Sequence, residues 1–207
     1  MKKLLLSLFI VHCSLFIGVA PAAVDNNLVS KAETYLNSIT GMTGDFTQVA
    51  GGKKDSGVFS MLRPGRVRLD YKAAPIQLIS DGKDLYFFDK SLDQITTIPL
   101  NSTPAGILMR KNINLKTDDI VVSSTASDAK TFSLTMHLRD SAGLGTMNVV
   151  FDNSPVKLNS WTVKDATGAE TRVKFSDLKT KTDFSKNYFQ IQRHKTVSTS
   201  GGDSFYE

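Results

Sequence analysis

The stretch from Gly57 to Tyr71 reads GVFSMLRPGRVRLDY and holds two segments in which polar and apolar residues alternate. In an extended strand, Val67, Leu69 and Tyr71 point to one side and the intervening charged residues point to the other. The junction Arg63-Pro64-Gly65 separates the two segments, because proline cannot donate to a sheet and glycine favours turns. The stretch predicts two paired strands with one apolar face and an arginine at their junction.

The same alternation continues along most of the chain. About ten strand-like runs follow one another at spacings of roughly ten residues, joined by turns rich in Gly, Asn, Asp and Ser. Asp81-Gly82-Lys83 is the strongest hairpin signal, because glycine tolerates a positive φ. No helical segments alternate with the strands, as a parallel sheet would require. The pattern predicts a mainly β (α+β) fold with a sequentially wound antiparallel sheet or barrel.

Two segments have helical patterns. Apolar residues recur at helical spacing in Asn26–Thr40, and Asp25 or Asn26 can cap its start. The second segment, Pro104–Lys111, is short and apolar and has its proline in the first turn. Two short helices can lie across a large apolar face but can hardly fill it, so an incompletely filled apolar concavity and a fully packed barrel core both remain open.

The apolar sides of the predicted strands supply the candidates for lining such a concavity. Methionine among them suits an adaptable lipid surface, although it also fills ordinary cores. The candidate cavity residues are Met61, Val67, Leu69, Tyr71, Phe132, Leu134, Met136, Met147, Val149, Phe151, Trp161 and Phe175.

The N-terminus has the order of a secretory signal peptide. Lys2 and Lys3 precede an apolar run from Leu4 to Ala20, and Ala20-Pro21-Ala22 resembles a cleavage site. The run is at the short limit for a membrane anchor. We therefore expect cleavage and export, and the bacterial style of the signal indicates the periplasm.

Removal of the signal defines the expected organisation of the chain. Residues 1–22 are the signal, residues 23–197 form a single domain, and residues 198–207 are a disordered tail. The only cysteine, Cys13, lies in the signal, so the mature chain is expected to have no disulfide and no thiolate.

Charge and motifs exclude several functions. The chain has 25 Lys and Arg against 20 Asp and Glu, an excess too small and too scattered to indicate nucleic-acid binding. Neither His137 nor His194 has a neighbour that suggests a triad or metal-ligand spacing. We expect no enzymatic activity, no cofactor and no metal site.

Three quoted segments resemble the LolA family, the periplasmic carriers of outer-membrane lipoproteins. They are GVFSMLRPGRVRLDY, APIQLISDGKDLYFFDKSLDQITTIPL and STPAGILMRKN, and the Arg-Pro junction and the SDGKDLYFFD hairpin are the most specific parts. Val67 and Leu69 stand at positions that are often aromatic in such carriers, and the C-terminal end is less typical.

The resemblance implies a highly twisted sheet that forms a half-open, incomplete β-barrel, closed by an N-terminal helix and a lid helix. It implies that Arg63 is a latch, which holds backbone carbonyls of the lid while the carrier is empty. The lid segment is Pro104–Lys111, with Pro104, Ile107, Leu108 and Met109 as its helix residues.

The implied function is that of a monomeric periplasmic carrier that binds lipoprotein acyl chains in a hydrophobic cavity. Its implied partners are an inner-membrane ABC-type lipoprotein release complex and an outer-membrane lipoprotein receptor. A LolA-like module that senses or binds lipid or lipoprotein and regulates a partner is the alternative, because relatives of the fold have different functions. A secreted enzyme is a third, less favoured hypothesis.

Overall fold

The computed structural model describes residues 23–191 of the 207-residue chain, without the side chains of residues 141, 142 and 144. The predicted signal peptide, the predicted tail and His194 lie outside the described residues. Within the described part of the chain, no helix combines the length and the hydrophobicity needed to cross a membrane.

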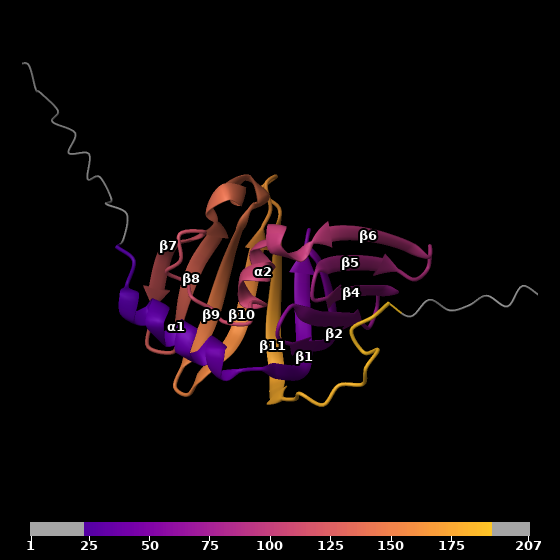
Figure 1. Ribbon diagram of the computed structural model, residues 1–207, viewed down its shortest axis with the longest axis horizontal. Helices are drawn as coiled ribbons and strands as arrows, with labels where there is room; N and C mark the ends of the chain where they lie inside the picture. Colours follow the sequence, from indigo (N-terminus) through magenta and orange to yellow (C-terminus); the bar gives the residue numbers. More distant parts are fainter. Residues whose placement is uncertain (1–22, 192–207) are drawn as a thin grey trace, which may run out of the picture.

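The described residues form a mainly β fold built on one antiparallel sheet of 11 strands (Figure 1). This confirms the predicted class. The strands are β1 Gly41–Ala50, β2 Lys53–Leu62, β3 Arg66–Tyr71, β4 Ile76–Asp81, β5 Asp84–Asp89, β6 Gln94–Pro99, β7 Ile120–Ser127, β8 Thr131–Leu138, β9 Thr146–Asn153, β10 Val156–Lys164 and β11 Glu170–Thr180.

Helices lie at the predicted places but are shorter than predicted. Helix α1 spans Asn26–Ser38, and Asp25 caps it by accepting a hydrogen bond of 2.8 Å from the Asn27 amide. Helix α2 spans Pro104–Leu108 and begins with its proline, as expected. Two 3₁₀ turns complete the elements, η1 at Leu100–Ser102 and η2 at Arg139–Leu144.

The strand order explains why a connection must cross the sheet. It runs β6-β5-β4-β3-β2-β1-β11-β10-β9-β8-β7, so the first and last strands pair in the middle. Strands β6 and β7 are consecutive in the chain but lie at opposite ends of the sheet. The segment between them, which contains η1 and α2, therefore passes over one face of the sheet.

Both helices pack on this same face. Helix α1 contacts β8, and α2 contacts β8 and β9 (Figure 1). Val29, Ala32 and Leu36 recur at the spacing of one helical face, and each is at most 3% exposed. They join the residues predicted to share the apolar side of β8 and β9 in one core. We call this the inner face of the sheet.

The outer face has a cover that the sequence did not predict. Residues 181–191 pack against β2, β3 and β4, where Phe189 is buried. The Tyr188 hydroxyl lies 3.0 Å from the Ser60 hydroxyl, and Arg68 donates a 2.7 Å hydrogen bond to the Tyr188 carbonyl. This cover explains why Ile79 is fully buried although it points away from the helices.

Candidate functional site

An apolar cavity of about 410 Å³ opens on the inner face beside the N-terminal end of α2. Residues from β1, β3–β6, β10 and β11 line it, together with residues 102–105. Its apolar lining side chains are Leu69, Leu78, Leu85, Ile98, Trp161, Val163 and Val173. Apolar lining with few polar groups is typical of a site for an apolar ligand. We call this cavity the upper pocket.

Gln48, a polar residue that lines the upper pocket, is held in place by a residue outside the pocket. Gln48 lines the pocket, and its Oε1 atom accepts a 2.8 Å hydrogen bond from the Tyr71 hydroxyl. Burial raises the pKa of Tyr71, so this hydroxyl stays a donor at neutral pH. The predicted cavity residue Tyr71 therefore orients a lining residue instead of lining the pocket itself.

Arg63 connects both helices to the junction between β2 and β3. Its Nε atom donates a 3.1 Å hydrogen bond to the Leu108 carbonyl at the end of α2. Its Nη1 atom donates to the Leu36 carbonyl in the last turn of α1. The last carbonyls of a helix have no partner within the helix, so one guanidinium supplies donors to two helix ends.

The Arg63 guanidinium is held in a desolvated position. The residue is 7% exposed, and burial lowers its pKa from 12.5 to about 10, an effect that Tyr35 partly opposes. It therefore remains charged at neutral pH, and hydrogen bonds from a charged donor are stronger than neutral ones. The backbone adds a further contact, because the Gly65 amide donates a 2.8 Å hydrogen bond to the Met109 carbonyl.

Helix α1 also binds the strap, by which we mean residues 109–119 between α2 and β7. The Asn37 side chain donates a 2.8 Å hydrogen bond to the Ile113 carbonyl and accepts one of 2.9 Å from the Ile113 amide. Glu33, one turn earlier, accepts a hydrogen bond from the Leu115 amide. Helix α1, the strap and α2 are thus linked to one another as well as to Arg63.

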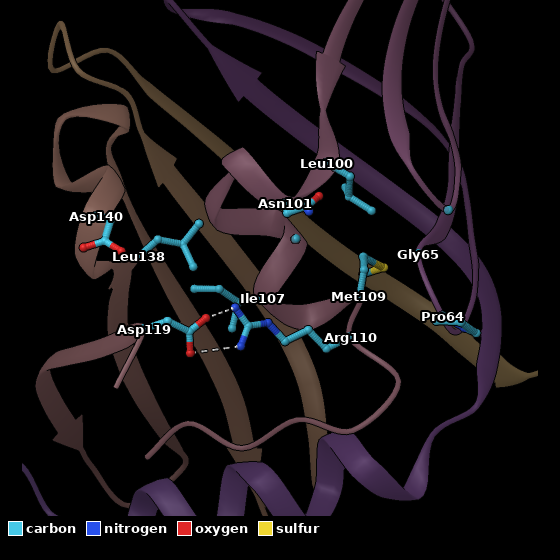
Figure 2. Close-up of a pocket in the computed structure, with 12 residues that line it drawn as sticks. Pro64, Gly65, Leu100, Asn101, Ile107, Met109, Arg110, Asp119, Leu138 and Asp140 are labelled. Atoms are coloured by element: carbon cyan, nitrogen blue, oxygen red, sulfur yellow. Dashed lines mark hydrogen bonds and ion pairs between the residues drawn. The ribbon is translucent and has the colours of Figure 1, made fainter. Parts of the chain in front are cut away.

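A second cavity, of about 530 Å³, lies on the other side of α2 (Figure 2). Figure 2 shows Arg110, just after α2, pointing toward Asp119 at the end of the strap, where the two form an ion pair. Hydrogen bonds from Arg110 lower the pKa of Asp119 to about 2. The ion pair between Arg110 and Asp119 lines this cavity, whereas none of the described residues that line the upper pocket is charged.

The predicted cavity residues all point to the inner face, but most of them do not line the upper pocket. Leu69 and Trp161 line it, and Phe175 lines a separate cavity near the end of α1. The remaining residues apart from Tyr71 are buried beneath the helices or between the strands. These are Met61, Val67, Phe132, Leu134, Met136, Met147, Val149 and Phe151.

The predicted lid residues surround the pocket region. Pro104 lines the upper pocket, Ile107 and Met109 line the cavity of Figure 2, and the Leu108 carbonyl accepts from Arg63. The candidate residues from the sequence did not include the lining residues on β4–β6. On β10 and β11 they included Trp161 but none of the other lining residues. The alternation of residues in IQLIS and DLYFFD could have assigned Leu78 and Leu85 to the inner face of their strands. The missed residues are Gln48, Leu78, Leu85, Ile98, Val163, Thr171 and Val173.

Curated relatives match most of this chain in sequence, and solved structures align with it at low identity. An Outer-membrane lipoprotein carrier protein from Neisseria meningitidis serogroup C is 28% identical over 198 residues, which are 91% of this chain and 93% of the relative. One from Chromohalobacter salexigens is 29% identical over 185 residues, 83% of this chain and 87% of the relative. A LolA superfamily protein from Nitrosomonas europaea aligns with a TM-score of 0.40 at 14% identity, covering 82% of this chain and 99% of that one.

A family model identifies the chain more directly. The model described as Outer membrane lipoprotein carrier protein LolA matches residues 37–192. The match includes all of the strands, α2, the strap and Arg63. The chain therefore belongs to the LolA family of outer-membrane lipoprotein carrier proteins.

Proposed function

We propose that this protein carries lipoproteins through the periplasm by holding their acyl chains in a hydrophobic cavity. It receives them from an inner-membrane ABC-type release complex and delivers them to an outer-membrane receptor. The observation that carries the proposal is the apolar upper pocket beside α2, together with a buried arginine that binds both helix ends. The names of the relatives support the same role.

In this proposal the sheet acts as a half-open barrel and the helices act as its lid. The lid comprises α1, α2 and the strap, which cover the inner face between the two ends of the sheet. Arg63 is the latch, because it is the donor shared by α1 and α2. The carrier works as a monomer, since one chain supplies both the cavity and the lid.

The physics of acyl chains requires that the cargo never enters water as a free molecule. Each buried methylene contributes roughly 0.8 kcal/mol, so a partly sheltered set of about 20 methylenes represents about 16 kcal/mol. Spontaneous release into water would be extremely slow at that free energy. Cargo must pass from one apolar surface directly to the next, and the mechanism uses no catalytic group and no cofactor.

The latch makes delivery favourable by weakening the loaded state. Cargo in the cavity displaces α2, which separates Arg63 from the carbonyls of Leu36 and Leu108. Each hydrogen bond is worth about 1 kcal/mol net, and a buried group left without a partner costs about 1–3 kcal/mol. Cargo therefore binds less tightly than the apolar contacts alone would allow, and a receptor without such a latch takes it over.

Replacement of Arg63 tests this mechanism. Arg63→Leu removes both side-chain hydrogen bonds, so we expect the variant to accept lipoprotein from the release complex but to retain it when the receptor is added. The measurement is the fraction of purified lipoprotein that moves from carrier to receptor with time. Arg172→Leu, which changes an exposed arginine on β11, is the matched control.

Two outcomes would contradict the proposal. Transfer by Arg63→Leu at the wild-type rate would exclude the latch. If depletion of the protein left lipoproteins in the outer membrane and altered only a stress response, the carrier function itself would be excluded.

A further inference from the structure

Strands β10 and β11 pair over only part of their length. Their pairing runs from Lys164 opposite Glu170 to Ser160 opposite Lys174. Beyond that level, β10 pairs only with β9, and β11 pairs only with β1. The sheet is therefore split between these two strands at the end nearer to α1.

Both strands carry a bulge where the split begins. The register of β10 on β9 shifts between Leu158 and Ser160, and the register of β11 on β1 shifts after Ser176. Asp177, in the second bulge, has a φ of 53°, in the left-handed region that residues other than glycine rarely adopt. An extra residue bends the strand that contains it, and both bulges lie in or beside the part of the strands where β10 and β11 do not pair.

A cavity of about 550 Å³ occupies the split, and we call it the lower pocket. Its floor is apolar, with Met42, Leu158 and Phe175 each at most 7% exposed. Val156 and Leu178 also line the pocket from β10 and β11, and its charged lining residues are Asp152, Lys157, Asp177 and Lys179. The buried apolar side chains of Met42, Leu158 and Phe175 can contact the apolar part of a ligand that lies inside the sheet.

The lower pocket continues the upper pocket along the same strands and on the same face. On β10, Val163 and Trp161 line the upper pocket, and Leu158 and Val156 line the lower one. The same succession occurs on β11, from Val173 to Phe175. A chain that lies along these strands in the upper pocket therefore points toward the lower pocket.

Three aromatic rings separate the two pockets. The ring centroids of Trp161 and Phe175 are 4.6 Å apart, and Phe59 lies 5.7 Å from Trp161 and 4.8 Å from Phe175. Trp161 lines the upper pocket and Phe175 lines the lower one, so these two rings form the partition.

The length of an acyl chain determines whether the chain fits within the upper pocket or extends into the lower one. A bilayer core is about 30 Å thick, so the chains of one leaflet extend about 15 Å. Val163 pairs with Thr171, and Phe175 lies four residues further along β11, which is about 13 Å at a rise of about 3.3 Å per residue. A chain of about 15 Å that starts at the level of Val163 therefore reaches Phe175, which lines the lower pocket.

We propose that the lower pocket is a second acyl-chain compartment, which receives the methyl ends of chains that enter through the upper pocket and pass the Trp161–Phe175 partition. This inference rests on the proposed carrier function and names the part of the wall that long chains use. Its ligand is a saturated chain too long for the upper pocket.

Tyr35 couples this compartment to the latch. Its hydroxyl accepts a 2.9 Å hydrogen bond from the Leu158 amide in the split, and its ring packs against Phe151 at 5.8 Å. The next residue, Leu36, offers its carbonyl to Arg63. When cargo breaks the Arg63 contact, the end of α1 is released, and Tyr35 leaves the lower pocket with it.

Binding of fatty acids of increasing length tests the inference. The probes are octanoate, dodecanoate and octadecanoate, with affinity measured by calorimetry on the purified protein. Apolar burial predicts a rise of about fourfold in affinity per methylene that is sheltered. Val156→Phe and Leu178→Phe fill the lower pocket, so we expect at least a tenfold loss of octadecanoate affinity and unchanged dodecanoate affinity.

Val49→Phe is the matched control, because Val49 is an exposed valine on β1 outside both pockets. If Val156→Phe and Leu178→Phe bind octadecanoate as wild type does, the second compartment does not exist, and the carrier proposal is untouched. If the wild-type protein binds none of the three probes, the carrier proposal fails and the compartment fails with it.

A measurement on the wild-type protein avoids any dependence on the folding of the variants. Trp161 is the only tryptophan of the chain, so its fluorescence reports on the partition alone. Octadecanoate brominated near the middle should quench Trp161 more strongly than octadecanoate brominated at the methyl end, since the chain passes the ring and ends below it. Stronger quenching by the methyl-end bromine would show that the chain stops at the partition, which overturns the inference.

Discussion

Removal of the Asn37 side chain should loosen the strap without loosening the sheet. The amide group of Asn37 makes two hydrogen bonds to the backbone of Ile113, at 2.8 and 2.9 Å, and Ile113 is 3% exposed. At about 1 kcal/mol net for each bond, Asn37→Ala should lower the free energy of strap opening by about 2 kcal/mol. Since 1.4 kcal/mol is a factor of ten, opening should become about 30-fold more frequent.

Amide hydrogen exchange of Leu115 is the assay. Leu115 keeps its own hydrogen bond to Glu33 in the variant, so faster exchange reports strap opening rather than the loss of its own partner. The Val149 amide on β9, an interior strand of the sheet, should be unaffected, because its exchange requires global opening. Thr34→Ala, on the same helix but without a contact to the strap, is the control for helix propensity.

The result can refute the reasoning in two ways. Exchange of Leu115 within twofold of wild type would show that Asn37 does not hold the strap. Equal acceleration at Leu115 and Val149 would show that the strap opens only when the whole domain unfolds. The first outcome removes Asn37 from the link between α1 and the strap, and the second shows that the strap does not open independently of the sheet.

Two further perturbations test the strap and the sheet. The pKa of Asp119 is lowered from 3.8 to about 2 through Arg110, so the ion pair stabilises the fold above pH 3.8 and is lost as the pH falls through about 2. Asp119→Asn should therefore lower the free energy of unfolding in urea titrations above pH 3.8 but not near pH 2, and an equal effect at both pH values would show that the ion pair does not stabilise the fold. Gly57→Ala places a Cβ 2.0 Å from the Asp70 carbonyl oxygen and 2.6 Å from the Phe46 ring, which should lower the unfolding free energy by about 1–3 kcal/mol in urea titrations, whereas wild-type stability would mean that the strands separate freely at this point.

The local features of the fold were predictable because they depend on neighbouring residues. Alternation placed Val67 and Leu69 on the buried face of β3 and Arg66 and Arg68 on the other, as the structure confirms. Strand geometry has a period of two, so this assignment needs no knowledge of the partner strand. The cap at Asp25 depends on sequence neighbours in the same way.

The candidate site was predictable only in part. A family resemblance identified Arg63, but the residues it contacts, Leu36 and Leu108, do so through backbone carbonyls. Every residue has a carbonyl, so no side-chain pattern marks which ones an arginine will reach. The contact of Asn37 with Ile113 has the same character, since an asparagine on a helix surface is equally consistent with exposure to solvent.

The amino-acid sequence by itself determined the strand pattern, the two short helices, the inner apolar face and the absence of any recognisable catalytic motif. Only the tertiary structure decided that β1 pairs with β11, that residues 181–191 cover the outer face, and that β10 and β11 part at two bulges. The physical reason is the separation along the chain of the residues that determine each feature. Alternation and capping arise from residues a few positions apart, whereas pairing and cavities arise when segments distant in the chain compete to bury the same surface.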